Sequence, residues 1–246
     1  MTDERKLKAS KLLTTIEGIR QRLDKRFPGA GLSLVAGQVA KITEEAVERA
    51  KIIARPDWRL RAGLAVAVVV CIVAVVVYTQ DSPDQTSRWQ SLLQFLDVAK
   101  GSAAVLLAAA AFLFTLETRL KRRRTMQAVH ELRAVAHIID MHQLGKNPDR
   151  LGDPDQPVLI GESGKPASAD DLGRYLHYCT ELLAVISKIG QLYVQDFPDT
   201  AAMTAVDHFE DLATGLSGKI WQKLMILDRV RSDSGSPAAP QNAANK

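Results

Sequence analysis

The chain has 246 residues, 46% of them hydrophobic, and a formal net charge of +4 at pH 7. Its apolar residues are concentrated in two stretches, a distribution that argues against one soluble core spread along the whole chain. The two cysteines, Cys71 and Cys179, fall in segments that are not expected to meet, which excludes a disulfide framework and a multi-cysteine zinc site.

Residues 1–56 are predicted to form two cytoplasmic amphipathic helices. The first ends at Phe27-Pro28-Gly29, because proline and glycine stop a helix. Its apolar stripe is narrow, which favours packing against another helix over binding to a membrane surface. The second helix begins near Ser33 and is compatible with an intramolecular bundle or with a coiled-coil contact. The two stripes consist of Leu12, Ile16, Ile19 and Leu23, and of Val35, Val39, Ile42, Ala46 and Ile53.

Residues 57–120 are predicted to form a two-span membrane hairpin, with spans at about 62–79 and 100–118 and an outer loop at 80–99. The central runs, 62–78 and 101–116, contain no Asp, Glu, Lys or Arg. At about 1.5 Å per residue, the first run reaches roughly 26 Å, which is close to the thickness of a hydrocarbon core. The first span is also the expected targeting signal.

Cationic residues predict the orientation of this hairpin. Five stand between Arg49 and Arg61 and five between Arg119 and Arg124, whereas the loop between the spans carries only Arg88 and, at its end, Lys100. Since Lys and Arg are retained on the cytoplasmic side, both termini are expected there. The same basic segments are expected to contact anionic lipid headgroups.

Small residues recur along both spans, and small residues let helices approach closely within a membrane. Gly63, Ala67 and Cys71 are spaced by four on the first span, and Ala104 and Ala108 lie on the second. These stripes are compatible with tight packing of the hairpin itself and with self-association.

Asp97 and Lys100 are three residues apart near the outer end of the second span. Their spacing predicts a polar pair on one helix face at the outer mouth. Interfacial charges that reach water explain this pair better than an ion pathway does, because neither span carries a charge at its centre.

Residues 121–144 are predicted to continue the second span as a basic juxtamembrane helix, followed by a Pro/Gly-rich linker at 145–168. A helical hairpin is expected at 169–231, with Ser168 as its N-cap and Phe197-Pro198-Asp199 as its turn. A disordered tail is expected at 232–246. The expected buried positions are Leu132, Val135, Ile138 and Ile139, then Leu172, Leu176, Cys179, Leu183, Ile186 and Leu192, and finally Val206, Phe209, Leu216, Ile220, Leu224 and Leu227, with Trp221 beside the last seam.

The histidines are the candidates for metal chemistry. His130 and His137 are seven residues apart and share a helix face, and Asp140 follows three residues later. Such a set could bind a metal ion if another helix supplied further ligands, for example His177 or His208. Polar histidines that hydrogen-bond between packed helices are the simpler interpretation.

No motif identifies an enzyme, a catalytic residue or a cofactor. The segment Gly161–Lys165 resembles a phosphate loop but lacks its first glycine, since Leu159 stands there, and Pro166 replaces the required Ser or Thr. Cys179 lies on an apolar stripe and is expected in the core. Nucleic-acid binding is not expected, because the basic segments lack interleaved aromatic residues.

Two segments, HELRAVAHIIDMHQL at 130–144 and GLSGKIWQKLMIL at 215–227, resemble stretches of an uncharacterised bacterial two-span inner-membrane protein family with no assigned function. The resemblance covers roughly the C-terminal half of the chain. It implies a location in the bacterial inner membrane and carries no catalytic role.

The sequence therefore predicts an all-α fold, in which a two-span transmembrane helical hairpin is joined to a cytoplasmic helical bundle. The leading functional hypothesis is a membrane-anchored scaffold or assembly protein that forms homo-oligomers and presents a cytoplasmic interaction surface to a protein partner. An alternative is a two-span effector or channel-like protein that permeabilises the membrane, based on layout alone. A second alternative is a metal-binding sensor or hydrolase that uses His130, His137 and Asp140.

Overall fold

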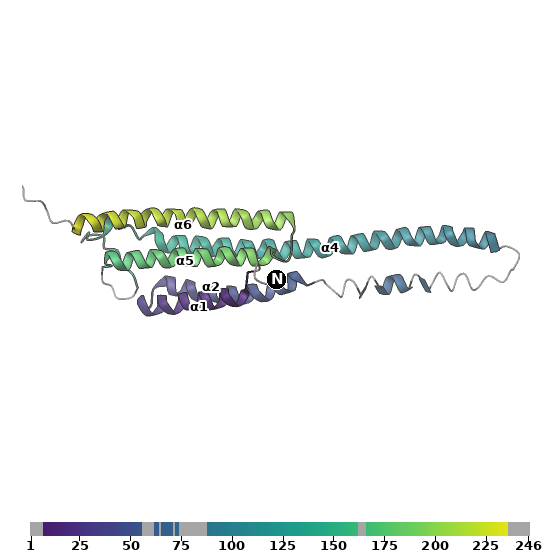
Figure 1. Ribbon diagram of the computed structural model, residues 1–246, viewed down its shortest axis with the longest axis horizontal. Helices are drawn as coiled ribbons and strands as arrows, with labels where there is room; N and C mark the ends of the chain where they lie inside the picture. The colour runs from purple at the N-terminus through teal and green to yellow at the C-terminus, as the bar shows by residue number, and fades with distance from the viewer. Residues whose placement is uncertain are drawn as a thin grey trace, which may run out of the picture. The chain divides into compact units, whose positions relative to one another are not determined.

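The computed structural model describes residues 7–55, 62–63, 65–70, 72–73, 88–161 and 166–235, without the side chains of 88–107 and 233–235. Its elements are the α-helices α1 (Ala9–Arg26), α2 (Gly31–Ala54), α4 (Arg88–Leu144), α5 (Ala169–Val194) and α6 (Thr200–Gly235), with a short 3-10 helix η2 (Pro148–Arg150) (Figure 1). The prediction of an all-α fold is confirmed. The chain divides into a bundle unit, Met1–Ala54 with Thr125–Lys246, and a second unit, Arg55–Arg124.

Helices α1 and α2 form a hairpin in the bundle unit. The backbone N–H of Phe27 donates to the carbonyl of Leu23, and Gly29 then adopts a positive φ of 69°, which closes the turn after Pro28. This confirms the helix end predicted at Phe27-Pro28-Gly29. The predicted stripe of α1 is buried along its whole length, at Leu12, Ile16, Ile19 and Leu23.

Helix α5 is the central helix of the bundle and packs against α1, α2 and α6 (Figure 1). It begins as predicted, because the Ser168 hydroxyl oxygen accepts from the backbone N–H of Asp171. Burial raises the pKa of the Cys179 thiol to about 12, so this cysteine is a core residue and no nucleophile at neutral pH. The predicted core positions of α5 are all buried: Leu172, Leu176, Cys179, Leu183, Ile186 and Leu192.

Helix α6 runs alongside α5. Its apolar stripe is buried at Val206, Phe209, Leu216, Ile220 and Leu227, while Leu224 is partly buried against the core. Trp221 is 63% exposed. The helix continues to Gly235 and not to Arg231, where the sequence predicted its end.

The last part of α4, from residue 125, also belongs to the bundle. Leu132, Val135 and Ile139 are buried as predicted, but Ile138 is 37% exposed. One residue rotates a helix by about 100°, so Ile138 points away from the face that Ile139 occupies. The helix continues without a break to Leu144, as predicted from the absence of Pro and Gly before Gly145.

In the second unit, no helix of the described ranges is both long and apolar enough to cross a membrane. Most of the first predicted span, including Cys71, lies outside the described residues, as do the side chains of Asp97, Lys100 and Ala104. Gly63, Ala67 and Ala108 are described and are exposed.

Candidate functional site

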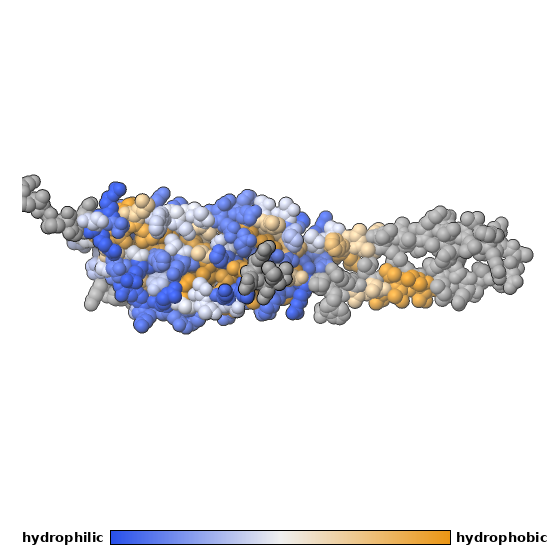
Figure 2. All heavy atoms as spheres, in the orientation of Figure 1, coloured by the Kyte–Doolittle hydropathy of each residue, from blue (hydrophilic) through white to orange (hydrophobic). Residues whose placement is uncertain are grey.

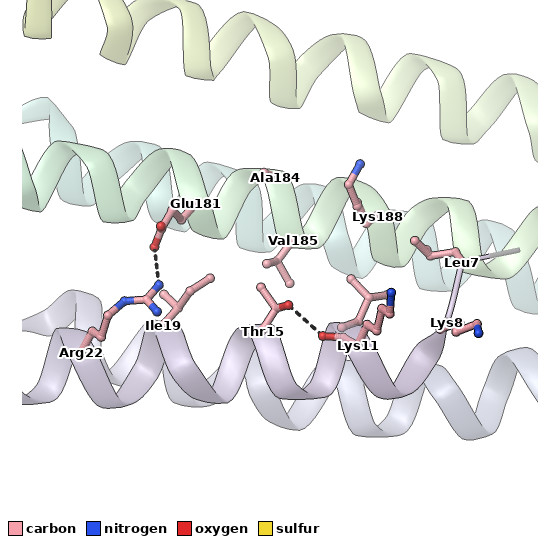
Figure 3. A pocket seen from close by; sticks show the side chains of 11 residues that line it. Leu7, Lys8, Lys11, Thr15, Ile19, Arg22, Glu181, Ala184, Val185 and Lys188 are labelled. Atoms are coloured by element: carbon pink, nitrogen blue, oxygen red, sulfur yellow. Dashed lines mark hydrogen bonds and ion pairs between the residues drawn. The ribbon is translucent and has the colours of Figure 1, made fainter. Parts of the chain in front are cut away.

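A groove runs along the surface of the bundle between α1 and α5, with a volume of about 340 Å³ (Figure 3). Its floor is apolar, because Leu12, Ile19 and Val185 are buried side chains of the core that remain within reach of the groove. Its rim carries the charged residues Lys8, Lys11, Arg22, Glu181 and Lys188. Four of these five rim residues are cationic, so the groove is basic.

The two ends of the groove differ in charge. At one end, Arg22 Nη2 and Glu181 Oε2 form an ion pair of 3.2 Å that links α1 to α5 (Figure 3). Glu181 Oε1 also lies 3.5 Å from Nε2 of His177. At the other end, the exposed ammonium groups of Lys11 and Lys188 have no ion-pair partner among the residues that the structure describes. The available positive charge is therefore concentrated at that end.

Both walls of the groove are held in place by contacts outside its rim. The backbone N–H of Leu7 donates to Oε1 of Gln195 at 2.7 Å, which ties the start of α1 to the end of α5. At the far end, Arg26 Nη2 lies 2.8 Å from Oδ1 of Asp171 and 3.1 Å from Oδ2 of Asp170. An apolar floor between two fixed helices, with cations on the rim, suits an amphipathic acidic helix.

A second hollow, of about 300 Å³, lies between α5 and α6. Its charges compensate one another: Arg174 Nε lies 2.9 Å from Oδ2 of Asp170, and this hydrogen bond lowers the pKa of the Asp170 carboxyl. Arg231 Nη2 approaches the same carboxylate at 3.9 Å. His177 borders this hollow, and its neighbour Glu181 borders the α1–α5 groove.

The candidate metal ligands do not form a site. Within the described ranges, no group of three or more His, Cys, Asp or Glu side chains is placed to hold a metal ion. His130 and His137 are exposed on α4, whereas Oδ1 of Asp140 accepts from Nε2 of Gln143 at 2.6 Å. His208 is exposed on α6 and does not join His177, which lies beside Glu181.

The phosphate-loop lookalike is only partly described, since residues 162–165 lie outside the described ranges. On either side of it, Leu159 and Pro166 form an isolated antiparallel bridge, and the N–H of Ala167 donates to the carbonyl of Val158 at 2.7 Å. The next helix begins only at Ala169. A phosphate loop needs a helix to begin at its end, and this segment leads into a bridge.

The groove residues Lys11, Arg22, Glu181 and Lys188 were not predicted from the sequence. A signal was present, because Lys11, Thr15, Ile19 and Arg22 follow one another at steps of four, four and three. That spacing places them on one edge of α1. It does not reveal that α5 forms the opposite wall.

The chain matches no protein-family model, and neither a curated protein nor a solved structure is similar to it.

Proposed function

We propose that this protein is a membrane-anchored helical scaffold that self-associates and presents the surface of its cytoplasmic bundle to a protein partner. The observation that carries the proposal is the apolar surface of the second unit. Seven large apolar side chains there are more than half exposed: Val66, Val69, Val70, Ile72, Val73, Phe112 and Phe114. Water would make such exposure unfavourable, by about 1.5–3 kcal/mol for each fully exposed side chain, whereas lipid would cover it.

The bundle unit has a more charged surface. It buries one apolar core, and its surface carries many charged groups together with some exposed apolar side chains, such as Leu34, Met141 and Trp221 (Figure 2). Figure 2 also shows the described part of residues 62–73 as hydrophobic. The exposed apolar side chains of the second unit support a membrane anchor. The apolar runs and their basic flanks at residues 49–61 and 119–124 support spans at about 62–79 and 100–118 with both termini in the cytoplasm. The bacterial inner membrane is the membrane that we propose for this anchor.

A scaffold explains the bundle better than an enzyme does. The α1–α5 groove combines an apolar floor with lysine and arginine side chains, which are groups that bind a partner, and its lining contains no His, Cys or Ser. Its acidic residue, Glu181, is paired with Arg22. Binding by such a surface needs no reacting group.

Measurements of membrane integration and of topology test the proposed membrane anchor. The full chain should stay in the membrane pellet after extraction with alkaline carbonate. Reporter fusions at residues 10 and 240 should both report a cytoplasmic location, and a tag inserted between Pro83 and Thr86 should be accessible from outside intact cells. Extraction into the soluble fraction, or termini on opposite sides, would contradict the proposed anchor. Growth arrest with dye entry on expression would favour the membrane-permeabilising alternative.

A further inference from the structure

We propose that two copies of the bundle pair in the same orientation, with the α1–α5 groove of each copy receiving the outer face of α6 from the other. The outer face of α6 is defined here by Asp207, Asp211, Gly218, Trp221 and Met225. This pairing rests on the self-association in the proposed function and specifies the surfaces that produce it.

The groove and α6 lie on opposite sides of one exposed strip of α5. His177, Ala184 and Lys188 are exposed along this strip. Ala184 and Lys188 line the groove toward α1, whereas His177 lines the hollow toward α6. Figure 1 shows the same order, with α5 between α6 and α1. The groove and α6 therefore flank the same exposed strip of α5.

The outer face of α6 carries negative charges that can pair with the lysines of the groove. Asp207 and Asp211 are exposed, four residues apart, and neither has an ion-pair partner among the residues that the structure describes. Trp221 is 63% and Met225 61% exposed. Trp221 lies ten residues, or about 15 Å, from Asp211 along the helix. An exposed tryptophan and exposed carboxylates on one helix match an apolar groove with a lysine rim.

Gly218 leaves room for a close neighbour on this face. A glycine in a helix is unfavourable relative to alanine unless something must approach the backbone closely. A Cβ atom at Gly218 would meet no atom of the bundle within 4 Å. The backbone at Gly218 is therefore accessible to a second helix, which is compatible with the proposed pairing.

The axial positions of the two surfaces agree. Ser187 Oγ donates to Oε1 of Glu210 at 3.1 Å, so Glu210 lies at the level of Ser187 and Lys188 along the bundle. Asp207 and Asp211 are within one turn of Glu210. Rotation by 180° about an axis parallel to the helices leaves each residue at the same level along the bundle. It places α6 of one copy opposite the α1–α5 groove of the other. It therefore brings Asp207 and Asp211 of the partner subunit to Lys11 and Lys188.

The same two-fold rotation places Trp221 of one copy beside the groove of the other. Trp221 lies between Glu210 and Leu227 along α6, and Leu227 is opposite Gly173, where a Cβ would come within 3.3 Å of it. The level of Trp221 is therefore that of residues between Gly173 and Ser187 on α5, where Glu181 pairs with Arg22. The partner's Trp221 would reach this end of the groove, and a guanidinium group such as that of Arg22 is favoured beside an indole face.

Charge reversal on the full-length chain in detergent tests the pairing. One variant carries Lys11→Glu with Lys188→Glu, and the other carries Asp207→Lys with Asp211→Lys. Each alone should dimerise about 30-fold more weakly than the wild type, because four attractive rim pairs per dimer become repulsive. An equimolar mixture should recover dimers, since both interfaces of the mixed pair again join opposite charges. Sedimentation equilibrium of differently labelled copies measures all three.

The control is Lys41→Glu with Lys219→Glu, which makes the same change in net charge as the Lys11→Glu/Lys188→Glu variant. Both positions are exposed and lie outside the two surfaces, so dimerisation should be unchanged. Melting temperatures of all variants should agree with that of the wild type, because every substituted side chain is exposed. A wild-type chain that stays monomeric would contradict the self-association itself. Dimers that persist in either variant, or a mixture that fails to recover them, would overturn this pairing but not the self-association. The same results would be obtained if the groove binds another protein and not a second copy.

Discussion

Two partly buried lysines lie near the C-terminal end of α4 and donate to backbone carbonyl groups. Lys146 follows α4, and Lys223 belongs to α6. Lys223 Nζ donates to the carbonyl of Gln143 at 2.7 Å, and Lys146 Nζ donates to the carbonyl of Leu159. Burial lowers the pKa of both ammonium groups. The last carbonyls of a helix are the negative end of its dipole, so these cations stabilise the end of α4 and fix the segment that follows.

His142, in the same region, makes a pH-dependent contribution to the free energy of unfolding. Burial lowers the pKa of its imidazole, and the positive charge of Lys146 lowers it further. The unfolded chain therefore binds this proton more readily than the folded chain does. The free energy of unfolding should be at its full value above about pH 6.5, the pKa of a free histidine, and should fall as the pH drops below it.

The test is thermal unfolding of the full chain in detergent between pH 5 and 7.5. The wild-type melting temperature should fall toward pH 5, and His142→Gln should reduce that slope because glutamine binds no proton. His130→Gln is the matched control, since His130 is exposed on the same helix. An identical slope in wild type and His142→Gln would show that another group is responsible.

Gly190 and Gly37 are both helical glycines, yet their surroundings differ. A Cβ at Gly190 would lie 3.1 Å from Cδ1 of Phe209, a fully buried ring, whereas one at Gly37 would meet nothing within 4 Å. Gly190→Ala should destabilise the bundle, because overpacking of about 1–3 kcal/mol exceeds the gain in helix propensity. Gly37→Ala should stabilise it by up to about 1 kcal/mol. Denaturant unfolding compares them, and equal effects would contradict close packing of α5 on α6.

At the scale of the helix, α6 depends on one buried stripe. Leu216 is 4% exposed and belongs to the core with Phe209 and Ile220. Leu216→Asp would bury an unpaired carboxylate or separate the helices, at a cost of several kcal/mol.

Limited proteolysis in detergent should therefore cleave Leu216→Asp readily between residues 170 and 230, while the variant still reaches the membrane. Gln222→Asp is the control, because it adds the same charge at an exposed position of the same helix and should remain resistant. Wild-type resistance in Leu216→Asp would mean that the α6 stripe is not a structural core.

At the scale of the whole molecule, periodicity was sufficient to predict the helices of the bundle unit and most of their buried faces. Ser168 and Phe27-Pro28-Gly29 mark helix ends through local hydrogen bonding and backbone conformation, which a short segment contains in full. The α1–α5 groove could not be predicted in this way. Lys11 and Lys188 line one hollow although they lie near opposite ends of the chain, and no local pattern states which helices become neighbours.

Which charged side chains form ion pairs also depends on which helices become neighbours. Residues 1–61 carry 14 basic and 8 acidic side chains, and residues 151–246 carry 8 basic and 13 acidic ones. This uneven distribution is compatible with the ion pairs between Arg22 and Glu181 and between Arg26 and Asp171. It did not indicate which cations stay without a partner. That depends on the distance between side chains of different helices, and a single exposed pair contributes too little energy to be specified by composition.

The central position of α5 has a consequence for synthesis. α1 and α2 are complete once residue 54 has been made, but the helix that covers their apolar faces begins at Ala169. At about 5–20 residues per second, the ribosome needs on the order of 10 s to reach it. During that delay, side chains such as Leu23 and Leu32, which are fully buried in the finished bundle, lack the part of their core that α5 supplies. We therefore expect the nascent N-terminal hairpin to expose apolar surface to chaperones and proteases until α5 has been made, and a chain that stops before α5 to be degraded more readily.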